Sequence, residues 1–468
     1  MLPRSSSALV GAIAVAVGSA SGAPSGPPIR IGSTLALTGP LASTALVHQL
    51  VGEIYVEQIN KKNGLLGRPV EWIVKDDQSK PELARTLYEQ LITVDKVDLL
   101  MGPYATGAIL SAMGVAQRYN KILIHHTFGI PSLAKYDAQF PTWSLGADPA
   151  ATFPNTLLDA LAATPKPPKT IAIVTSKFPS VHFMSLGARE VAKKRGLQEV
   201  VFLEWDFGNR DFGAIAARVK DANPDFVWVG AIGLEGNQLL DAMKKIDYTP
   251  PLHFYMYPAP GPMAQAPEGK NALAATIFEE NQPYLNNPGA AEFVKLFNER
   301  AAKAGLSYTG VETQAAASYS AWQVLDAAVT ATKSLDDKVL AEWLRKNRVD
   351  TIQGKLRFDG PSNYGDDLMV VEAGAERPLG HRLAEEYRGA RRHADDEVVA
   401  RWGSRAFRSS RNRRSRECSS GPSTGSWGSV SACRGGSCAR STWRILRSRS
   451  SPRIFAISSR QSDASIRS

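Results

Sequence analysis

Two pairs of adjacent side chains are the first candidates for chemistry in this chain: His125-His126 and Asp76-Asp77. Imidazoles ligate metals and move protons, and paired carboxylates can carry out acid–base catalysis. Neighbouring residues on a strand point to opposite faces, so His125 and His126 cannot jointly hold one metal ion. We therefore favour a single pocket or core histidine. For Asp76-Asp77, which follows an apolar run, we favour a solvated strand end over a catalytic pair.

Signatures of catalysis are missing from residues 29–371. This part of the chain has no Gly-x-Ser-x-Gly elbow, Walker loop or His-Glu-x-x-His, and no Gly-x-Gly-x-x-Gly after a predicted strand. The three cysteines, Cys418, Cys433 and Cys438, all lie beyond it. Thiolate chemistry, disulfides and Cys-ligated metals are thereby excluded from this part. We expect no enzyme, no cofactor and no metal site.

The charge of the chain is divided unevenly. The whole sequence has 55 basic and 45 acidic residues, but residues 372–468 contain 20 Arg, no Lys and 9 acids. The remainder has 35 basic against 36 acidic residues. Because this remainder has no basic excess, it is not expected to attract nucleic acid or anionic lipid.

The N-terminus has the pattern of a secretory signal. Arg4 precedes the apolar run 8–17, and small residues follow, with Gly18 and Ala20 placed for cleavage after Ala20. The run is about half the length that spans a bilayer as a helix. A short buried helix is the alternative interpretation. We expect residues 1–20 to be removed and the protein to be exported to the periplasm in soluble form, without a membrane span.

Hydrophobic periodicity predicts an α/β fold. Short β-branched or aromatic runs alternate with helical patterns at 81–94, 106–119, 183–195, 212–222 and 235–246. The predicted strands are residues 29–35, 70–75, 98–101, 122–125, 170–175, 200–205, 226–229 and 253–255. Nearly continuous apolar strands between helices indicate parallel sheets covered on both faces. Two such series, divided near Gly146, predict two open sheets, which bind ligands at the carboxyl ends of their strands.

Five segments, in order, carry a resemblance to a known family. They are residues 29–32 leading into 37–40, residues 60–70, Gly102-Pro103-Tyr104, residues 211–225, and residues 350–359. Together they resemble the extracytoplasmic substrate-binding proteins of ABC transporters, of the branched-chain amino acid or leucine-binding-protein type. The resemblance implies a two-lobed type I periplasmic binding protein fold that binds a small molecule between its lobes and delivers it to permease subunits in the inner membrane.

The resemblance also implies the lobe boundaries. Three crossings join the lobes, so the first lobe comprises residues 29–145 plus 280–345, and the second comprises 146–279 plus 346–371. Hinge closure buries the ligand. Two alternatives remain open: a ligand-sensing subunit of a signalling receptor with the same fold, and an exported α/β enzyme.

In this family, the loop that opens the helix after the third strand holds a ligand carboxylate, and a helix N-terminus suits an anion. Here the loop is Tyr104-Ala105-Thr106, with Thr106 at the hydroxyl position; plain N-capping is the alternative. The next loop maps to Thr127 and Gly129, and the glycine lacks the expected hydroxyl. His126 beside it is a candidate donor.

Amino-acid binders of the family use aromatic residues and an acid for the ligand ammonium, and the acid position maps to Tyr257-Pro258. Since no acid stands there, Glu235 is a candidate substitute, or else a first-turn helix acid. Phe178, Tyr255 and Tyr257 are aromatic candidates, against ordinary packing. Carboxylate capture is thus expected to be retained and ammonium capture altered, so an aromatic or apolar carboxylate, or an amide, is as plausible as leucine.

Residues 372–468 are Arg- and Ser-rich and show no sustained hydrophobic period. We interpret them as a frameshifted or disordered tail without a stable fold. The alternative is a basic arm for nucleic acid, which does not suit an exported protein.

Overall fold

The computed structural model describes residues 23–143, 146–162, 164–256, 272–365, 370–373, 444–447 and 454–457. The signal segment 1–20 and Tyr257 lie outside these residues. Two compact units were found, 1–390 and 391–468. Within the described ranges, no helix combines the length and hydrophobicity that crossing a membrane requires.

The first sheet is parallel throughout and has the order β2-β1-β3-β4-β5. Its strands are β1 (Ile29–Leu35), β2 (Val70–Asp76), β3 (Leu99–Met101), β4 (Leu123–His125) and β5 (Gln139–Pro141). Alternate residues serve opposite faces: Leu99 packs in one core cluster and Leu100 in another. This explains why the strands are apolar at nearly every position.

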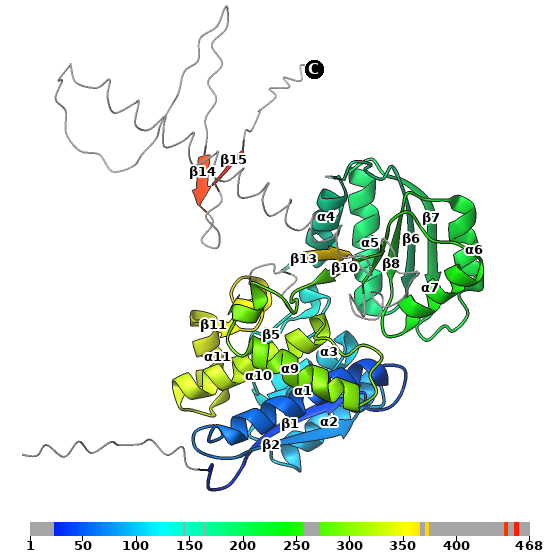
Figure 1. Cartoon of the computed structure of the whole chain (residues 1–468). Coiled ribbons are helices and arrows are strands. Elements are labelled where there is room, and N and C mark those ends of the chain that lie inside the picture. Colours follow the sequence, from blue (N-terminus) through cyan, green and yellow to red (C-terminus); the bar gives the residue numbers. More distant parts are fainter. Residues whose placement is uncertain are drawn as a thin grey trace, which may run out of the picture. The chain divides into compact units, whose positions relative to one another are not determined.

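Helices cover both faces of this sheet (Figure 1). On one face pack α1 (Ala42–Lys61), α9 (Ala290–Lys303), α10 (Thr313–Thr332) and α11 (Asp337–Lys346). On the other pack α2 (Pro81–Thr93) and α3 (Thr106–Tyr119). Short 3-10 turns occur at η1 (Pro131–Leu133), η3 (Tyr284–Asn286) and η4 (Pro361–Asn363).

The second sheet has the order β13-β10-β9-β8-β6-β7, in which only β13 runs antiparallel. Its strands are β6 (Thr170–Ser176), β7 (Gln198–Trp205), β8 (Phe226–Gly230), β9 (His253–Tyr255), β10 (Ala272–Thr276) and β13 (Val370–Ala373). One face is covered by α4 (Pro149–Ala162) and α5 (Pro179–Lys194), the other by α6 (Gly213–Ala222) and α7 (Glu235–Lys245). The predicted α/β fold with two doubly covered sheets is confirmed.

One expected boundary is wrong. The hairpin of β11 (Arg348–Thr351) and β12 (Gly354–Arg357) was assigned to the second lobe as part of 346–371. Its Val349 and Leu356 instead pack in the first core, beside α10 and α11. The alternation predicted the strand pair, but it could not show which core would bury the apolar side chains. Of the described residues after 346, only β13 joins the second sheet.

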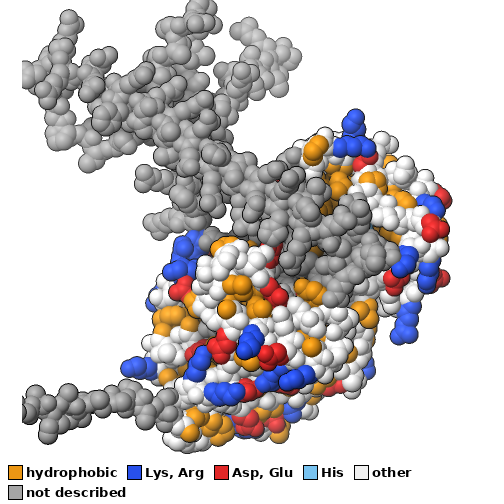
Figure 2. Space-filling view, viewed as in Figure 1, with side chains coloured by type: hydrophobic (Ala, Val, Ile, Leu, Met, Phe, Trp, Pro, Cys, Tyr) orange, Lys and Arg blue, Asp and Glu red, His pale blue; other side chains and the backbone are white. Residues whose placement is uncertain are grey.

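The second unit is described only at β14 (Arg444–Arg447) and β15 (Ile454–Ile457), which pair antiparallel. A hairpin therefore occurs in a segment for which no stable structure was expected. On the visible face of the first lobe, acidic and basic side chains are intermixed (Figure 2), and residues 1–371 are close to neutral in sum.

Candidate functional site

A small cavity lies where the carboxyl-end loops of the two sheets meet. Its volume is about 20 Å³, roughly enough for one water molecule. The first lobe supplies loop and helix-start residues, and the second supplies Ser180 and Ile232. The lining residues are Tyr104, Ala105, Thr106, Thr127, Phe128, Gly129, Trp143, Ser180, Ile232 and Gln314. Four sequence candidates, Tyr104, Ala105, Thr106 and Thr127, are thus brought together.

Thr106 is the first residue of α3. Ala105 holds the N-cap position and has no capping side chain, so Thr106 is not a plain N-cap. Its Oγ1 accepts a hydrogen bond from the Gly129 backbone N–H at 3.2 Å. The hydroxyl proton can therefore be donated to another group. Together with the positive end of the α3 dipole, this arrangement suits an anionic oxygen.

Tyr104 closes the inner side of the cavity. Its ring is 2% exposed and lies 4.9 Å from the ring of His48 on α1. Burial raises the pKa of its phenol, whose oxygen also bonds the side chains of Thr44 and Gln314. The hydroxyl therefore remains neutral and is held in place.

His126 does not line the cavity but lies behind Thr127. Its ring stacks on His48 with centroids 4.0 Å apart, and its Nδ1 is 3.3 Å from Thr127 Oγ1. Burial and the neighbouring imidazoles hold the pKa of His126 well below its usual value. The neutral ring packs against His48 and contacts Thr127, one of the lining residues, and its role as a ligand donor stays a prediction.

His125 is buried and pairs through Nε2 with Gln139 Oε1 at 2.5 Å. The residues that the structure describes contain no group of three or more His, Cys, Asp or Glu side chains suited to a metal ion.

Glu235 is committed to contacts within the second lobe. Its carboxylate accepts hydrogen bonds from the backbone N–H groups of Gly208 (3.1 Å) and Ile232 (3.4 Å), and from the hydroxyl of Ser176 (3.3 Å). Burial raises its pKa, partly offset by these hydrogen bonds. Glu235 is not among the lining residues, and its hydrogen bonds order the loop that presents Ile232.

The aromatic candidates of the second lobe also lie outside the cavity lining. Phe178 packs edge-on against Phe207, with ring centroids 4.9 Å apart. Tyr255 is fully buried in the core beneath α6 and α7, and its hydroxyl lies 3.1 Å from His253 Nδ1. Both rings thus pack against neighbours of their own lobe, and their role as ligand contacts stays a prediction.

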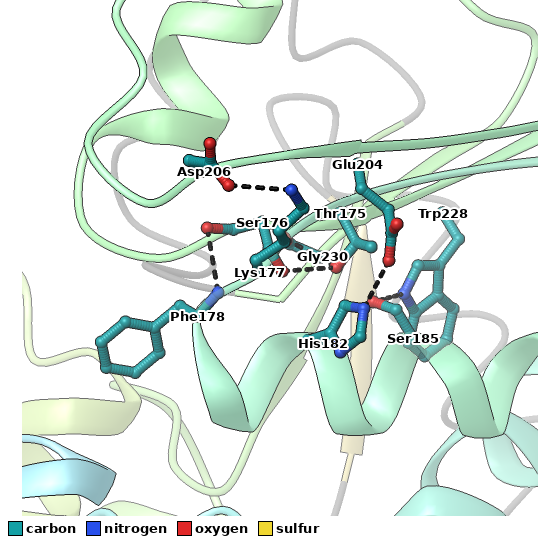
Figure 3. A network of polar contacts seen from close by, with 10 residues as sticks. All are labelled: Thr175, Ser176, Lys177, Phe178, His182, Ser185, Glu204, Asp206, Trp228 and Gly230. Atoms are coloured by element: carbon teal, nitrogen blue, oxygen red, sulfur yellow. Dashed lines mark hydrogen bonds and ion pairs between the residues drawn. The ribbon is translucent and has the colours of Figure 1, made fainter.

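A network of polar contacts surrounds the first turns of α5 (Figure 3). Lys177 pairs with Asp206 at 2.9 Å, and His182 contacts Glu204 at 2.5 Å. Ser185 Oγ accepts a hydrogen bond from Trp228 Nε1 at 2.9 Å. Gly230 permits the packing beside it, because a Cβ there would lie 2.1 Å from Ser185 Oγ.

Sequence reasoning missed Gln314, which comes from the first turn of α10. It is 2% exposed, lines the cavity, and its Oε1 has no hydrogen-bond partner among the described residues. The preceding N-cap residue, Glu312, accepts hydrogen bonds from the N–H groups of Gln314 (2.8 Å) and Ala315 (3.0 Å). An acidic residue before a long apolar helix is a local sequence signal for this helix start. No local sequence pattern shows that the helix start lies near the loops after β3 and β4.

Two doubly covered, mainly parallel sheets, with a cavity of apolar and neutral polar residues between the loops at their carboxyl ends, define a two-lobed solute-binding protein of the type I periplasmic binding class. The chain belongs to the periplasmic binding protein family, whose model matches residues 28–371.

Comparison with known proteins agrees with this assignment. The chain is 23% identical over 349 residues to the leucine-, isoleucine-, valine-, threonine-, and alanine-binding protein of Pseudomonas aeruginosa, covering 74% of this chain and 89% of that protein. It is 24% identical to the Leu/Ile/Val-binding protein of Escherichia coli, covering 71% and 86%.

Solved structures share the fold. A leucine-binding protein from Thermotoga maritima superposes with a TM-score of 0.61 at 19% identity, covering 75% of this chain and 96% of that chain. A solute-binding protein from Rhodopseudomonas palustris in complex with benzoate superposes with a TM-score of 0.61 at 20% identity, covering 75% and 97%.

Proposed function

We propose that this protein is the extracytoplasmic solute-binding component of an ABC importer, and that it captures a small organic carboxylate between its lobes. Thr106 carries the proposal: a hydroxyl at the start of α3 lies in the cavity where the lobes meet. There it combines a hydrogen-bond donor with the positive end of a helix dipole.

The remaining lining residues indicate the body of the ligand. Phe128, Trp143 and Ile232 provide apolar surface, and Thr127, Ser180 and Gln314 provide neutral polar groups. The described lining contains no Asp or Glu, and Glu235 is held by its own lobe. A ligand ammonium would therefore lack a carboxylate partner among the described residues, so we favour an aromatic or branched apolar carboxylate, such as benzoate, over an α-amino acid.

Binding then requires hinge motion. Benzoate is larger than the single water that the cavity holds here, so the lobes must separate to admit it, and lining side chains must move outward when the lobes close around it. The closed form would be recognised by permease subunits in the inner membrane. Export through the segment 1–20, a periplasmic location and the absence of catalysis belong to the same proposal.

Ligand-dependent thermal stabilisation tests it. The full chain is heated with millimolar benzoate, L-leucine, benzamide or no addition. At a hundred times Kd, a ligand that binds only the folded state stabilises it by about 2.7 kcal/mol. Benzoate should raise Tm and remain chemically unchanged. If a wide panel of carboxylates and amino acids produced no shift, the proposal would fail; a shift with leucine alone would refute the preference for carboxylates.

A further inference from the structure

A second and larger cavity lies wholly on the first lobe, between α1 and α10. It has a volume of about 850 Å³ and shares no lining residue with the interlobe cavity. We call it the α1–α10 groove; its lining residues are Tyr55, Gln58, Ile59, Lys62, Gly64, Leu66, Pro288, Gly289, Tyr319, Gln323, Asp326, Thr330 and Lys333. A volume of this size lies within the range of small-molecule sites.

One face of each helix forms the groove. The α1 residues Tyr55, Gln58 and Ile59 lie at intervals of three and four, with Lys62 directly after the helix. The α10 residues show the same spacing from Tyr319 to Thr330. Tyr55 reaches Asp326, whereas Gln58, further along α1, reaches Tyr319, earlier in α10. The helices are therefore antiparallel here, and their polar side chains meet in pairs along the groove.

Asp326 supplies a fixed negative charge. Its Oδ2 accepts a hydrogen bond from the Tyr55 hydroxyl at 2.9 Å, and its Oδ1 accepts one from Thr330 Oγ1 at 2.9 Å. Burial, followed by the nearby carboxylate, raises the pKa of Tyr55, so the phenol remains a donor. In the described part of the chain, no Lys, Arg or His forms an ion pair with Asp326.

Tyr55, whose hydroxyl bonds this carboxylate, belongs to a cluster of aromatic rings. Tyr55 and Tyr319 meet edge to face with centroids 5.1 Å apart, and Tyr55 stacks on Trp322 at 5.8 Å. A carboxylate beside aromatic rings is a combination that holds an organic ammonium ion, through an ion pair and cation–π attraction.

Gln58 adds a requirement for the ligand. It is 8% exposed; its Oε1 accepts the Tyr319 hydroxyl at 2.9 Å, while its Nε2 has no partner among the described residues. A buried N–H group without an acceptor is costly, so a ligand acceptor there would be stabilising. Gln58 follows Tyr55 by three residues, which places both side chains on one face of α1.

We propose that the α1–α10 groove binds a small organic ammonium compound that carries a carbonyl oxygen near its nitrogen. The ammonium pairs with Asp326 beside Tyr55 and Tyr319, and the carbonyl accepts a hydrogen bond from Gln58 Nε2. This site is independent of the interlobe cavity and does not depend on the ligand proposed for it.

Calorimetric titration of the full chain with three matched probes tests the site. L-leucinamide has both the ammonium and the carbonyl, isoamylamine has the ammonium alone, and 4-methylpentanamide has the amide alone. Leucinamide should bind saturably at millimolar concentration, isoamylamine more weakly, and 4-methylpentanamide not measurably. Asp326→Asn should weaken leucinamide about tenfold or more, because a hydrogen bond to a charged group is lost.

Three controls keep the test specific. Gln58→Leu should remove the preference for leucinamide over isoamylamine, and Asp241→Asn, at an exposed position of α7, should change nothing. Thr106→Val, in the interlobe cavity, should leave leucinamide binding intact. Folding of each variant is checked by its unfolding transition; if Asp326→Asn is destabilised, Tyr55→Phe, which keeps the ring, provides the second variant. Equal leucinamide affinity in folded Asp326→Asn, or loss of binding in Thr106→Val, would overturn the proposal.

Discussion

Gly129 and Ser180 approach each other across the interlobe cavity so closely that a Cβ on Gly129 would lie 2.6 Å from the Cβ of Ser180. Gly129 belongs to the first lobe, after β4, and Ser180 to the first helical turn of α5 in the second. Any larger residue at 129 would press the lobes apart. A side chain with the hydroxyl that the family resemblance implies at this position would not fit beside Ser180 in this arrangement of the lobes.

The first prediction concerns this approach. Gly129→Ser should weaken carboxylate binding about tenfold or more, because overpacking costs roughly 1–3 kcal/mol and here acts only on the closed form. Affinity is measured by calorimetry, and the lobe separation by small-angle scattering with and without ligand. The variant should fail to compact when ligand is added.

Gly114 provides a matched control. It lies inside α3, and a Cβ there would meet no atom within 4 Å. Gly114→Ala should leave affinity unchanged and stabilise the protein by about 0.5–1 kcal/mol, the usual gain for Gly to Ala in a helix. Gly129→Ser with unaltered affinity would show that the lobes do not need this contact to close.

The second prediction separates the contribution of the Thr106 hydroxyl to ligand affinity from the contribution of the side-chain volume. Thr106→Val keeps the volume but removes both the donor and the acceptor for the Gly129 N–H. We expect carboxylate affinity to fall by about 1.5–3 kcal/mol, the range for hydrogen bonds to charged groups. Thr106→Ser should retain most of the affinity. If the valine variant bound carboxylates as tightly as the wild type, Thr106 would be structural only.

The third prediction uses the unpartnered oxygen of Gln314. An acceptor at the cavity surface should favour ligands with a hydroxyl over those without one, so 3- or 4-hydroxybenzoate should bind better than benzoate. Gln314→Leu should abolish this difference while retaining benzoate binding. If Gln314→Leu still bound hydroxybenzoates better than benzoate, a residue other than Gln314 would recognise the ligand hydroxyl.

The fold could be predicted further than the site. Ile171 and Ala172 illustrate why: both are fully buried, one beneath α4 and α5 and the other beneath α6 and α7. Strands of this kind are apolar throughout, so their sequence predicts a parallel sheet with helices on both faces. For the same reason, the sequence does not show toward which face of the sheet a given side chain points. Tyr255 could not be distinguished from a cavity residue because both faces of its strand are apolar.

Site residues depend on contacts between distant segments. Glu235 was correctly placed at a helix start, but its partners Ser176 and Gly208 belong to other loops, and no local pattern shows that they satisfy the carboxylate. Gln314 reaches the cavity because α10, which follows most of the second lobe in the sequence, packs on the first sheet. Thr106 could be proposed from the sequence because its loop resembles a local pattern of the family, and the structure places it in the cavity lining.

The fourth prediction concerns acid stability. His48 is 2% exposed, neither ring nitrogen has a partner among the described residues, and burial lowers its pKa from 6.5 to about 3. Between these values the folded state binds fewer protons than the unfolded state, so stability is complete above pH 6.5 and is lost as the pH falls toward 3. His48→Phe retains a ring against His126 and removes this proton uptake. Relative to the variant, the wild type should lose up to about 1.4 kcal/mol for each pH unit below 6.5.

Glu312 provides a control of opposite sign. Burial raises its pKa from 4.5 to about 7, although the N–H groups of Gln314 and Ala315 oppose the shift. The folded state therefore binds the extra proton between pH 4.5 and 7, and this contribution to stability is lost as the pH rises through that range. Denaturant unfolding at several pH values should show that Glu312→Gln gains stability relative to wild type as the pH rises, whereas His48→Phe gains as it falls. Identical pH profiles for wild type and His48→Phe would mean that the buried imidazole takes up its proton without disturbing the fold. Burial of His48 against His126 and Tyr104 would then not lower its pKa as described.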